Sequence, residues 1–406
     1  MKVLHVNQSD ISGGAAIAAY RLHQGLLAQS INSQLLVGNA TSSCDKVQAI
    51  PRQRYIEKPL GVSLRSLGFN NLHLLNTFNI PQHILYKNAD IINFHNLHGE
   101  YFNYLAIPSI TQSKPTVFTL HDMWSFTGHC AYSYDCDRWK TGCGRCPYLT
   151  TYPSVQRDTT QWEWKLKNWV YSRSNLTVIA LSKWLLEIVK KSMLNRFPIY
   201  HIPNGIDTEA YQPIDSEQSK ALLGLPKGKK ILMFGAQILN DPRKGGDLLL
   251  KALTSLPTSL KAETLLLTMG DSSGALSNAV GMQTLNLGYV SSDRLKSIAY
   301  SAADLFIFPT RADNLPLVLQ ESMACGTPMV SFKVGGVSDL VRPEVTGYLA
   351  KPEDAEDFAN GIVQLLEDSN MRDRLSKQCR AIALQEYPLE LQAQRYIELY
   401  RQTLQN

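Results

Sequence analysis

The stretch that decides the fold reads Asp313-Asn314-Leu315-Pro316-Leu317-Val318-Leu319-Gln320-Glu321-Ser322. The residues that follow it are Met323-Ala324-Cys325-Gly326-Thr327-Pro328. Asparagine is a favourable N-cap, proline is tolerated in a first helical turn, and glycine suits the left-handed position past a helix end. These signals predict a short helix from Leu315 to Ala324, entered from a loop that carries Asp313.

Two carboxylates in this stretch, Asp313 and Glu321, stand on either side of the predicted helix start. If most of the stretch is helical, a rise of 1.5 Å per residue separates them by about 12 Å, roughly the distance between the two sugars of a nucleotide sugar. One carboxylate can hold a ribose diol while the other faces a hexose, with the diphosphate near the helix N-terminus. The alternative is two solvated acids on a surface helix, and the spacing alone does not separate the two interpretations.

Length and composition indicate a globular protein of two domains. The chain has 406 residues, of which 44% are hydrophobic, and a single ordinary core does not extend over that length. No run approaches the roughly 18 apolar residues of a membrane helix, and the N-terminus is polar by Asn7, which argues against an exported protein. We therefore expect a cytosolic protein, with peripheral contact at the inner face of the cytoplasmic membrane as an open alternative.

Short apolar runs alternate with helical segments in both halves of the chain, which predicts an α/β fold with doubly wound parallel sheets. We place one domain at residues 1–203, a second at 204–385, and a terminal helix at 386–406 that returns to the first domain. The strands are expected at residues 3–6, 34–38, 90–95, 116–120, 176–180, 199–202, 230–235 and 264–270.

The segments that flank the two carboxylates carry a family resemblance. An apolar run with its loop, residues 302–311, leads in, and a strand followed by Gly335-Gly336 leads out. Together they resemble the nucleotide-binding half of glycosyltransferase family 4, a retaining group with the GT-B fold of two facing Rossmann-like domains and a cleft between them. The family signature is Glu, seven residues, Glu; Glu321 matches it, whereas Asp313 is one methylene shorter than the family residue.

The resemblance implies roles for residues in the first domain. The loop Ser12-Gly13-Gly14-Ala15 ends a strand and opens a helix, and in the family it approaches the donor phosphate or the acceptor. His121 follows the strand at 116–120 and is similar to the family histidine that touches the donor sugar beside the bond that breaks. A lone histidine is otherwise more often a structural hydrogen-bonding residue.

In the second domain, the resemblance points to residues that would hold the leaving diphosphate. Lys244 matches the family lysine before glycine, but the usual arginine after the strand glycine is missing, because position 236 is alanine. Arg243 or Arg311 is the candidate to replace it. Near the diphosphate, Leu315 and Leu317 can donate backbone amides, whereas Pro316 cannot.

These residues indicate a retaining glycosyltransferase that moves a sugar from a nucleoside-diphosphate sugar to a saccharide or lipid-linked saccharide, without a catalytic metal. As in the family, the donor's own phosphate oxygen would take the acceptor proton. Two alternatives stay open: a nucleotide-sugar epimerase of the same architecture, and a saccharide- or nucleotide-binding module without activity. Ala236 and Asp313 favour the last of these.

Four of the seven cysteines lie within 17 residues and form a cysteine loop: Cys130, Cys136, Cys143 and Cys146. A Cys-x-x-Cys pair with two further thiols can bind a structural zinc ion; disulfides and unliganded thiols are the alternatives. Asp135 and Asp137 spell an Asp-x-Asp metal motif, but they stand inside this loop rather than after a buried strand. They are therefore not expected to bind a catalytic metal.

Residues 151–200 carry eight Lys or Arg against three acids, and also four of the six tryptophans. Basic side chains interleaved with tryptophan suit an anionic membrane interface, so peripheral contact through 157–191 is one interpretation. The other is a pair of ordinary helices with buried tryptophans and solvated lysines. No nucleic acid partner is expected, since no binding motif accompanies the charge. The residues concerned are Trp162, Trp164, Trp169 and Trp184, with Lys165, Lys167, Arg173, Lys183, Lys190 and Lys191.

Overall fold

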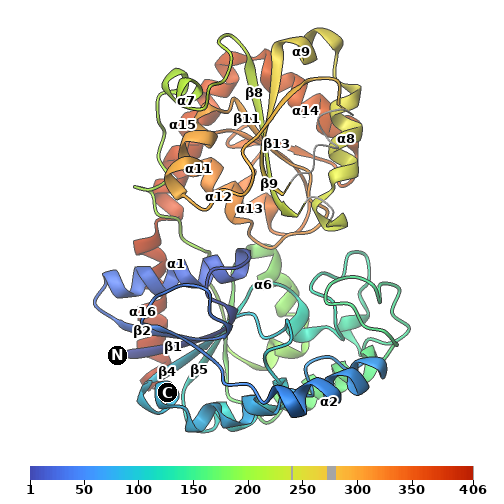
Figure 1. The fold of residues 1–406 in the computed structure, drawn as a ribbon, viewed down its shortest axis with the longest axis vertical. Coiled ribbons are helices and arrows are strands. Elements are labelled where there is room, and N and C mark those ends of the chain that lie inside the picture. Colours follow the sequence, from blue (N-terminus) through green and yellow to red (C-terminus); the bar gives the residue numbers. More distant parts are fainter. Residues whose placement is uncertain (239–240, 272–279, 406) are drawn as a thin grey trace. The chain divides into compact units, whose positions relative to one another are not determined.

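The computed structural model describes residues 1–238, 241–271 and 280–405, and its contacts divide the chain into two compact units (Figure 1). Unit 1 consists of Met1–Gly205 together with Glu390–Asn406, and unit 2 consists of Ile206–Leu389. The sequence had placed the boundaries after residues 203 and 385. No helix among the described residues has both the length and the apolar character needed to cross a membrane.

Unit 1 is built on a seven-stranded parallel sheet in the order β3-β2-β1-β4-β5-β6-β7. Its strands are β1 Lys2–Ser9, β2 Asn32–Asn39, β3 Val47–Ala49, β4 Ile91–Phe94, β5 Thr116–Leu120, β6 Thr177–Ala180 and β7 Ile199–His201. Its α-helices are α1 Gly14–Ala28, α2 Arg54–Ser66, α3 Ile84–Asn88, α4 Ile107–Thr111, α5 Thr160–Tyr171, α6 Lys183–Val189 and α16 Leu389–Gln405. Short 3₁₀ turns are η1 Leu75–Gln82, η2 Tyr104–Ala106, η3 Trp124–Phe126, η4 Arg138–Lys140 and η5 Met193–Arg196.

Both faces of this sheet are covered, because successive strand residues point to opposite sides. Leu4, Ile92 and Phe118 join a core with residues of α4, α5 and α6. Val3 and Val117, from the alternate positions, join a second core with residues of α1 and α16. Continuous apolar strands of this kind are typical of parallel sheets buried on both faces.

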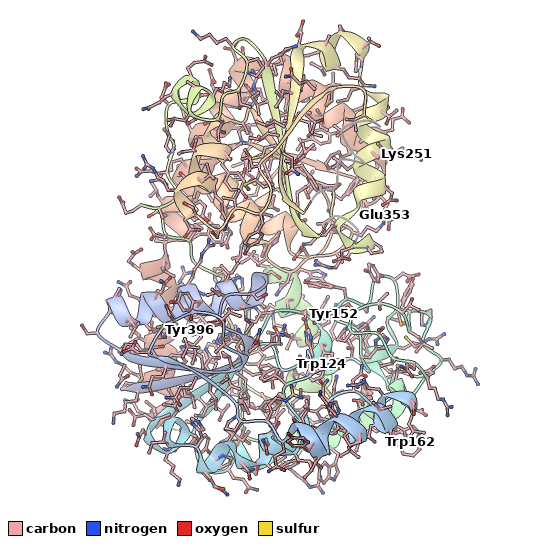
Figure 2. The ribbon with its side chains drawn as sticks, in the orientation of Figure 1. Trp124, Tyr152, Trp162, Lys251, Glu353 and Tyr396 are labelled. Atoms are coloured by element: carbon pink, nitrogen blue, oxygen red, sulfur yellow. The ribbon has the colours of Figure 1, made fainter. Side chains whose placement is uncertain are left out.

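The last helix, α16, is fixed to the middle strands of unit 1 by two buried tyrosines. The Tyr400 hydroxyl accepts a hydrogen bond of 2.7 Å from the Asn93 side chain in β4, and the Tyr396 hydroxyl lies 3.1 Å from the Thr119 hydroxyl in β5. Tyr396 lies among the strands in Figure 2. The C-terminal segment therefore completes the core of unit 1 although it follows unit 2 in the sequence.

Unit 2 repeats the architecture with a six-stranded parallel sheet in the order β10-β9-β8-β11-β12-β13. Its strands are β8 Lys230–Ile238, β9 Thr264–Asp271, β10 Gln283–Asn286, β11 Leu305–Phe308, β12 Met329–Phe332 and β13 Gly347–Ala350. Its helices are α7 Ser216–Leu222, η6 Pro242–Lys244, α8 Gly246–Ser255, α9 Thr258–Glu263, α11 Asp293–Ala302, α12 Leu317–Ala324, α13 Val337–Leu340, α14 Ala355–Glu367 and α15 Ser369–Glu386.

The helix between the two carboxylates begins later than predicted. Leu317 is its first residue, and Pro316 is the N-cap with extended backbone (φ −66°, ψ 123°), so neither Asn314 nor Leu315 is part of the start. Proline has no N–H and disfavours helical conformation in the residue before it. The part of the stretch from Asp313 to Pro316 is consequently loop, and the 12 Å estimate from a continuous helix does not apply.

The basic and tryptophan-rich stretch at 157–191 is only partly exposed, which corrects one expectation. The Lys167 side chain is buried, and its Nζ donates to the backbone oxygens of Trp124 (2.7 Å) and Thr127 (3.0 Å). Trp164 and Trp184 pack against the core of unit 1. Lys167 is thus a core residue and not part of an interface face.

Candidate active site

The polar residues of unit 2 gather where its strand order reverses. β8 pairs with β9 on one side and with β11 on the other, so successive crossovers leave in opposite directions at β8 and β11. In open parallel sheets ligands bind beyond the carboxyl ends of the strands at such a switch point. The η6 turn lies beyond β8, and the loop 309–316 follows β11 directly.

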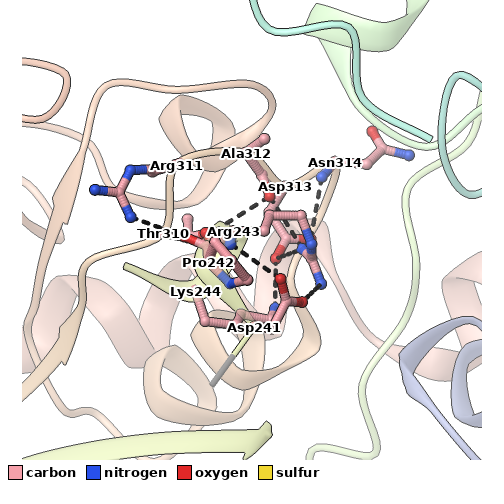
Figure 3. A network of polar contacts seen from close by, with 9 residues as sticks. All are labelled: Asp241, Pro242, Arg243, Lys244, Thr310, Arg311, Ala312, Asp313 and Asn314. Carbon is pink, nitrogen blue, oxygen red and sulfur yellow. Dashed lines mark hydrogen bonds and ion pairs between the residues drawn. The ribbon is translucent and has the colours of Figure 1, made fainter. Parts of the chain in front are cut away.

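A tight ion cluster joins these two segments (Figure 3). The Asp313 carboxylate accepts hydrogen bonds on Oδ2 from Arg243 (3.0 Å) and from Lys244 (2.9 Å). Arg243 also donates to the Ala312 backbone oxygen at 3.0 Å and lies 3.4 Å from the Asp241 carboxylate. Two cations are therefore held side by side by one acid at the end of the sheet.

Burial and charge act against each other within the cluster. Burial alone would raise the pKa of Asp313, but the neighbouring Lys244 and Arg243 outweigh it and hold the pKa below its usual value. Burial lowers the pKa of Lys244, and the Asp313 carboxylate opposes that shift. The ion pairs keep Asp313 negatively charged while the cations remain partly accessible, with side chains 24% and 20% exposed for Arg243 and Lys244.

Two glycines allow the backbone around Asp313 to close in. Gly245 has φ +68°, and a Cβ there would lie 2.0 Å from the Pro309 oxygen at the end of β11. Gly335 has φ +51°, and a Cβ there would lie 2.0 Å from the backbone oxygen of Asp313. A side chain at position 245 would push the η6 turn away from the end of β11, and one at position 335 would push its own turn away from Asp313, so both glycines permit the close backbone packing around Asp313.

Arg311, the other candidate for the missing arginine, is engaged elsewhere. Its guanidinium binds the Asp247 carboxylate with two hydrogen bonds of 2.7 and 2.6 Å, and its Nε donates to Glu353 at 3.0 Å. In Figure 3 the Arg311 guanidinium lies on the side of the cluster opposite Asn314. The structure thus brings Arg243 to Lys244 and Asp313, and pairs Arg311 with other acids.

Glu321 and the loop amides form the rest of the site in unit 2. Glu321 is buried in α12, and the Tyr300 hydroxyl donates to its Oε2 at 3.3 Å. The backbone N–H groups of Leu315 and Leu317 donate to no acceptor within the described residues. Because Leu317 opens α12, its amide lies at the positive end of the helix dipole.

In unit 1 the glycine loop opens α1 beyond β1. Gly13 has φ 93° and precedes the first helical residue, Gly14; a Cβ at either position would meet nothing within 4 Å. The loop is anchored by Asp10, a buried carboxylate that accepts hydrogen bonds from the amides of Thr41 and Ser42 beyond β2 (3.1 and 2.7 Å). The loop therefore leaves open space above two glycines, at the carboxyl edge of the sheet.

His121 ends a row of three imidazoles, of which His5 and His95 are buried and His121 is partly buried. Its Nε2 lies 3.1 Å from Nδ1 of His95, whose Nε2 lies 2.9 Å from Nδ1 of His5. Burial lowers the pKa of His121 to about 4, and the adjacent Asp122 only partly opposes it, so the ring is neutral near pH 7. Of the three neutral rings, only His95 is bonded within the row through both nitrogens, donating from one and accepting on the other, and these two bonds orient its ring relative to those of His5 and His121.

Sequence analysis missed Asp10, His95 and His5. His95 follows β4, the strand next to β5, and this position beyond a parallel strand was a signal that could have identified it. Asp10 likewise follows β1 directly. His5 lies in the middle of β1, where no sequence pattern distinguishes it from the apolar residues around it.

The four cysteines of the cysteine loop line one small cavity of about 20 Å³ together with His129. All four thiols are free, so the structure contains none of the disulfides considered from the sequence. The Gly128 amide donates to Cys143 Sγ at 3.2 Å, and the Tyr148 amide donates to Cys146 Sγ at 3.4 Å. Among the described residues, no group of three or more His, Cys, Asp or Glu side chains is arranged to hold a metal ion.

Comparison with known proteins assigns each half of the chain to a family model. Residues 12–210 match the family model "Glycosyltransferase Family 4", and residues 215–381 match the model "Glycosyl transferases group 1". The chain belongs to glycosyltransferase family 4. Because the two models together match both halves of the chain, the resemblance to this family seen in the sequence is confirmed. This glycosyltransferase takes its sugar from a nucleotide-sugar donor.

Individual relatives agree with that assignment. The glycosyltransferase is 26% identical over 360 residues to a putative colanic acid biosynthesis glycosyl transferase, WcaC, of Escherichia coli K12, covering 82% of this chain and 83% of the relative. Among solved structures, a sucrose-phosphate synthase from Thermosynechococcus elongatus superposes with a TM-score of 0.73, at 20% identity and 99% coverage of both chains. The Anabaena protein HepE in complex with UDP and glucose gives a TM-score of 0.70, at 19% identity and coverage of 98% and 99%. These likenesses confirm the predicted GT-B fold.

Proposed function

We propose that this glycosyltransferase transfers a hexose with retention of configuration, and that Arg243 and Lys244 hold the diphosphate of the donor. The observation that carries the proposal is the pairing of these two cations at the switch point of unit 2. Charge on the diphosphate grows as the glycosidic bond breaks, and fixed cations stabilise that charge without rearranging. Arg243 then replaces the arginine that Ala236 removes, in preference to Arg311.

Asp313 has a distinct part in this proposal. Its carboxylate pairs with both cations in the absence of a diphosphate, and a bound donor would compete for them. The shorter side chain suits this task because Oδ2 reaches both cations at 3.0 Å or less. We assign Glu321 to the ribose diol, since a carboxylate accepts two hydrogen bonds, and the amides of Leu315 and Leu317 to phosphate oxygens.

On the side of unit 1, we assign Gly13 and Gly14 to the approach of phosphate or acceptor, and His121 to the donor sugar. No nucleophile from the protein is required when the donor's own phosphate oxygen accepts the proton of the attacking hydroxyl. A catalytic metal is likewise not required, since Lys244 and Arg243 supply the positive charge. Asp135 and Asp137 lie in the cysteine loop of unit 1 and take no part.

We take the proposed donor and acceptor classes from the relatives. HepE is solved with UDP and glucose, which favours a uridine donor, and WcaC is described in colanic acid biosynthesis, which favours a saccharide or lipid-linked saccharide acceptor in polysaccharide assembly. Turnover of a panel of nucleotide sugars, with and without acceptor and with EDTA, tests the proposal. Transfer that depends on acceptor and persists in EDTA is expected; conversion of the donor alone would indicate an epimerase, and binding without turnover a non-catalytic module.

The substitution Glu321→Gln is expected to weaken donor binding by about 1 to 1.5 kcal/mol per hydrogen bond, because a charged hydrogen bond to the ribose is replaced by a neutral one. Glutamine keeps the volume of the buried side chain, so the fold should survive. Isothermal calorimetry with the nucleoside diphosphate measures the loss. Glu367→Gln, on the exposed end of α14 in the same unit, is the matched control, and equal affinity in both variants would remove Glu321 from the site.

We further propose that the cysteine loop binds a structural zinc ion through Cys130, Cys136, Cys143 and Cys146. The cavity they share has room for about one small atom, and amide N–H groups already donate to two of the sulfur atoms. The thiol side chains would have to rotate toward the cavity, because they do not form a metal site as they stand. Zinc would link a segment whose regular structure is a single 3₁₀ turn, η4.

Elemental analysis of protein purified without chelator is expected to find about one zinc ion per chain. The double variant Cys143→Ser with Cys146→Ser should lose that metal and unfold at a lower temperature, because the loop is no longer cross-linked. Cys44→Ser, elsewhere in unit 1, is the control that should retain both properties. Metal-free wild-type protein with four titratable thiols in the loop would eliminate the zinc site.

A further inference from the structure

Helix α2 carries exposed apolar residues on its outer side in addition to Leu60 and Leu64, which are partly buried on its inner side. Glu57 and Gly61 are buried on its inner side, and the Glu57 carboxylate pairs with Arg52 at 3.0 Å. On its outer side Tyr55 is 98% exposed and Val62 63% exposed. Ile56 and Leu67, just beyond the helix end, are also about half exposed. Packing within unit 1 therefore does not account for the apolar side chains on the outer side of α2.

A second exposed face, on α5, adjoins the end of this helix. Thr159, at the start of α5, donates from its hydroxyl to the Gly68 backbone oxygen beyond α2 at 2.6 Å. Trp162 is 61% exposed, Trp169 is 47% exposed, and their spacing of seven residues places them on one side of α5. Trp162 lies at the outer edge of unit 1 in Figure 2.

Basic side chains accompany the exposed rings. Lys165 Nζ lies 5.2 Å from the centre of the Trp162 ring, and the Arg173 guanidinium lies 4.4 Å from that of Trp169. On α2, Lys58 is exposed, and Arg65 pairs with Glu100 at 3.0 Å. Aromatic and aliphatic side chains flanked by lysine and arginine are the composition of segments that lie in the headgroup region of an anionic bilayer.

We propose that this surface docks the protein on a membrane rich in anionic lipids. The α2–α5 surface consists of Tyr55, Ile56, Val62 and Leu67 with Trp162 and Trp169, flanked by Lys58, Arg65, Lys165 and Arg173. The apolar side chains enter the boundary between headgroups and acyl chains, and the basic groups bind the phosphates. Membrane contact would thus involve α2 as well as the residues of 157–191 that the sequence indicated, and this docking is independent of the proposed chemistry.

Co-flotation of the full-length protein with vesicles tests the proposal. Binding is expected to vesicles of mixed phosphatidylcholine and phosphatidylglycerol and to be at least about tenfold weaker to phosphatidylcholine alone. Val62→Ser with Trp162→Ser, and separately Lys58→Ser with Lys165→Ser, should each weaken binding about tenfold or more. Leu222→Ser with Tyr289→Ser is the matched control in unit 2, because these side chains are 62% and 67% exposed.

Two results would overturn the proposal. One is the absence of binding to anionic vesicles. If, in addition, the free protein is a dimer that the Val62→Ser and Trp162→Ser variant abolishes, the surface would be assigned to a second copy of the chain. The other is binding that all the variants retain. Turnover with a water-soluble saccharide acceptor should be unchanged in every variant, so that failure of membrane docking is distinguished from failure of the transfer reaction itself.

Discussion

Lys244→Ala is expected to lower turnover by about 100- to 1000-fold, the range measured when one preorganised charge-stabilising group is removed from a transition state. Lys244 donates to Asp313 at 2.9 Å, so its ammonium is already fixed where the diphosphate would bind. Negative charge on that group grows during bond cleavage, and ground-state affinity should therefore fall less than turnover. Steady-state kinetics combined with calorimetric donor binding measure the two quantities separately.

The matched control for this variant is Lys251→Ala, which removes an exposed lysine from α8 in the same unit. It should leave both turnover and affinity at the wild-type level. If Lys244→Ala lowers donor affinity but leaves turnover unchanged, the lysine contributes uniform binding and not selective stabilisation of the transition state. In that case Arg243 would be the remaining candidate for the group that responds to the leaving charge.

His121→Ala is expected to reduce sugar transfer by about 100-fold or more while nucleotide affinity and thermal stability change little. The reason is the fixed position of its ring, which His95 holds at 3.1 Å in a row that ends at His5. Because the pKa of His121 is near 4, the neutral ring acts from about pH 5 upward, and its contribution should not change between pH 6 and 8.

Transfer rates for the variant at several pH values, with melting curves as the fold control, test this expectation. A variant with wild-type transfer would leave His121 as a structural member of the imidazole row. A loss of transfer that is explained by a lower melting temperature of the variant would likewise indicate a structural role for His121. His95→Phe offers a comparison, since it removes the partner of His121 without touching the residue that would face the donor.

Some features followed from the sequence because they depend on local pattern. The apolar run at 116–120 became β5 without a change at either end, and the apolar spacing after residue 388 became α16. The helix start at Leu317 was missed because two local rules disagreed: asparagine favours an N-cap at 314, whereas Pro316 holds the chain extended. In the folded chain the Gly336 amide donates to the backbone oxygen of Asp313 at 3.0 Å. This contact stabilises the extended loop and cannot be read from the local sequence.

Other features depended on partners far away in the sequence. Arg243 and Arg311 were equal candidates until the structure placed Asp247 and Glu353 beside Arg311. Lys167 was assigned to a solvated or membrane-facing side because lysine is almost never fully buried. Its partners are backbone oxygens about forty residues earlier, a distance over which periodicity carries no information.

The attachment of α16 to β4 and β5 has a consequence for how the protein is made on the ribosome. Unit 2 is a continuous stretch whose synthesis ends where α16 begins, whereas unit 1 lacks one covering helix until α16 leaves the exit tunnel. Domains normally complete their folding in the order of synthesis, N-terminal first. Here that order is reversed, because unit 1 keeps one apolar face of its sheet partly exposed until α16 packs on it. A chain truncated near residue 390 would retain this exposed face and would be prone to aggregation.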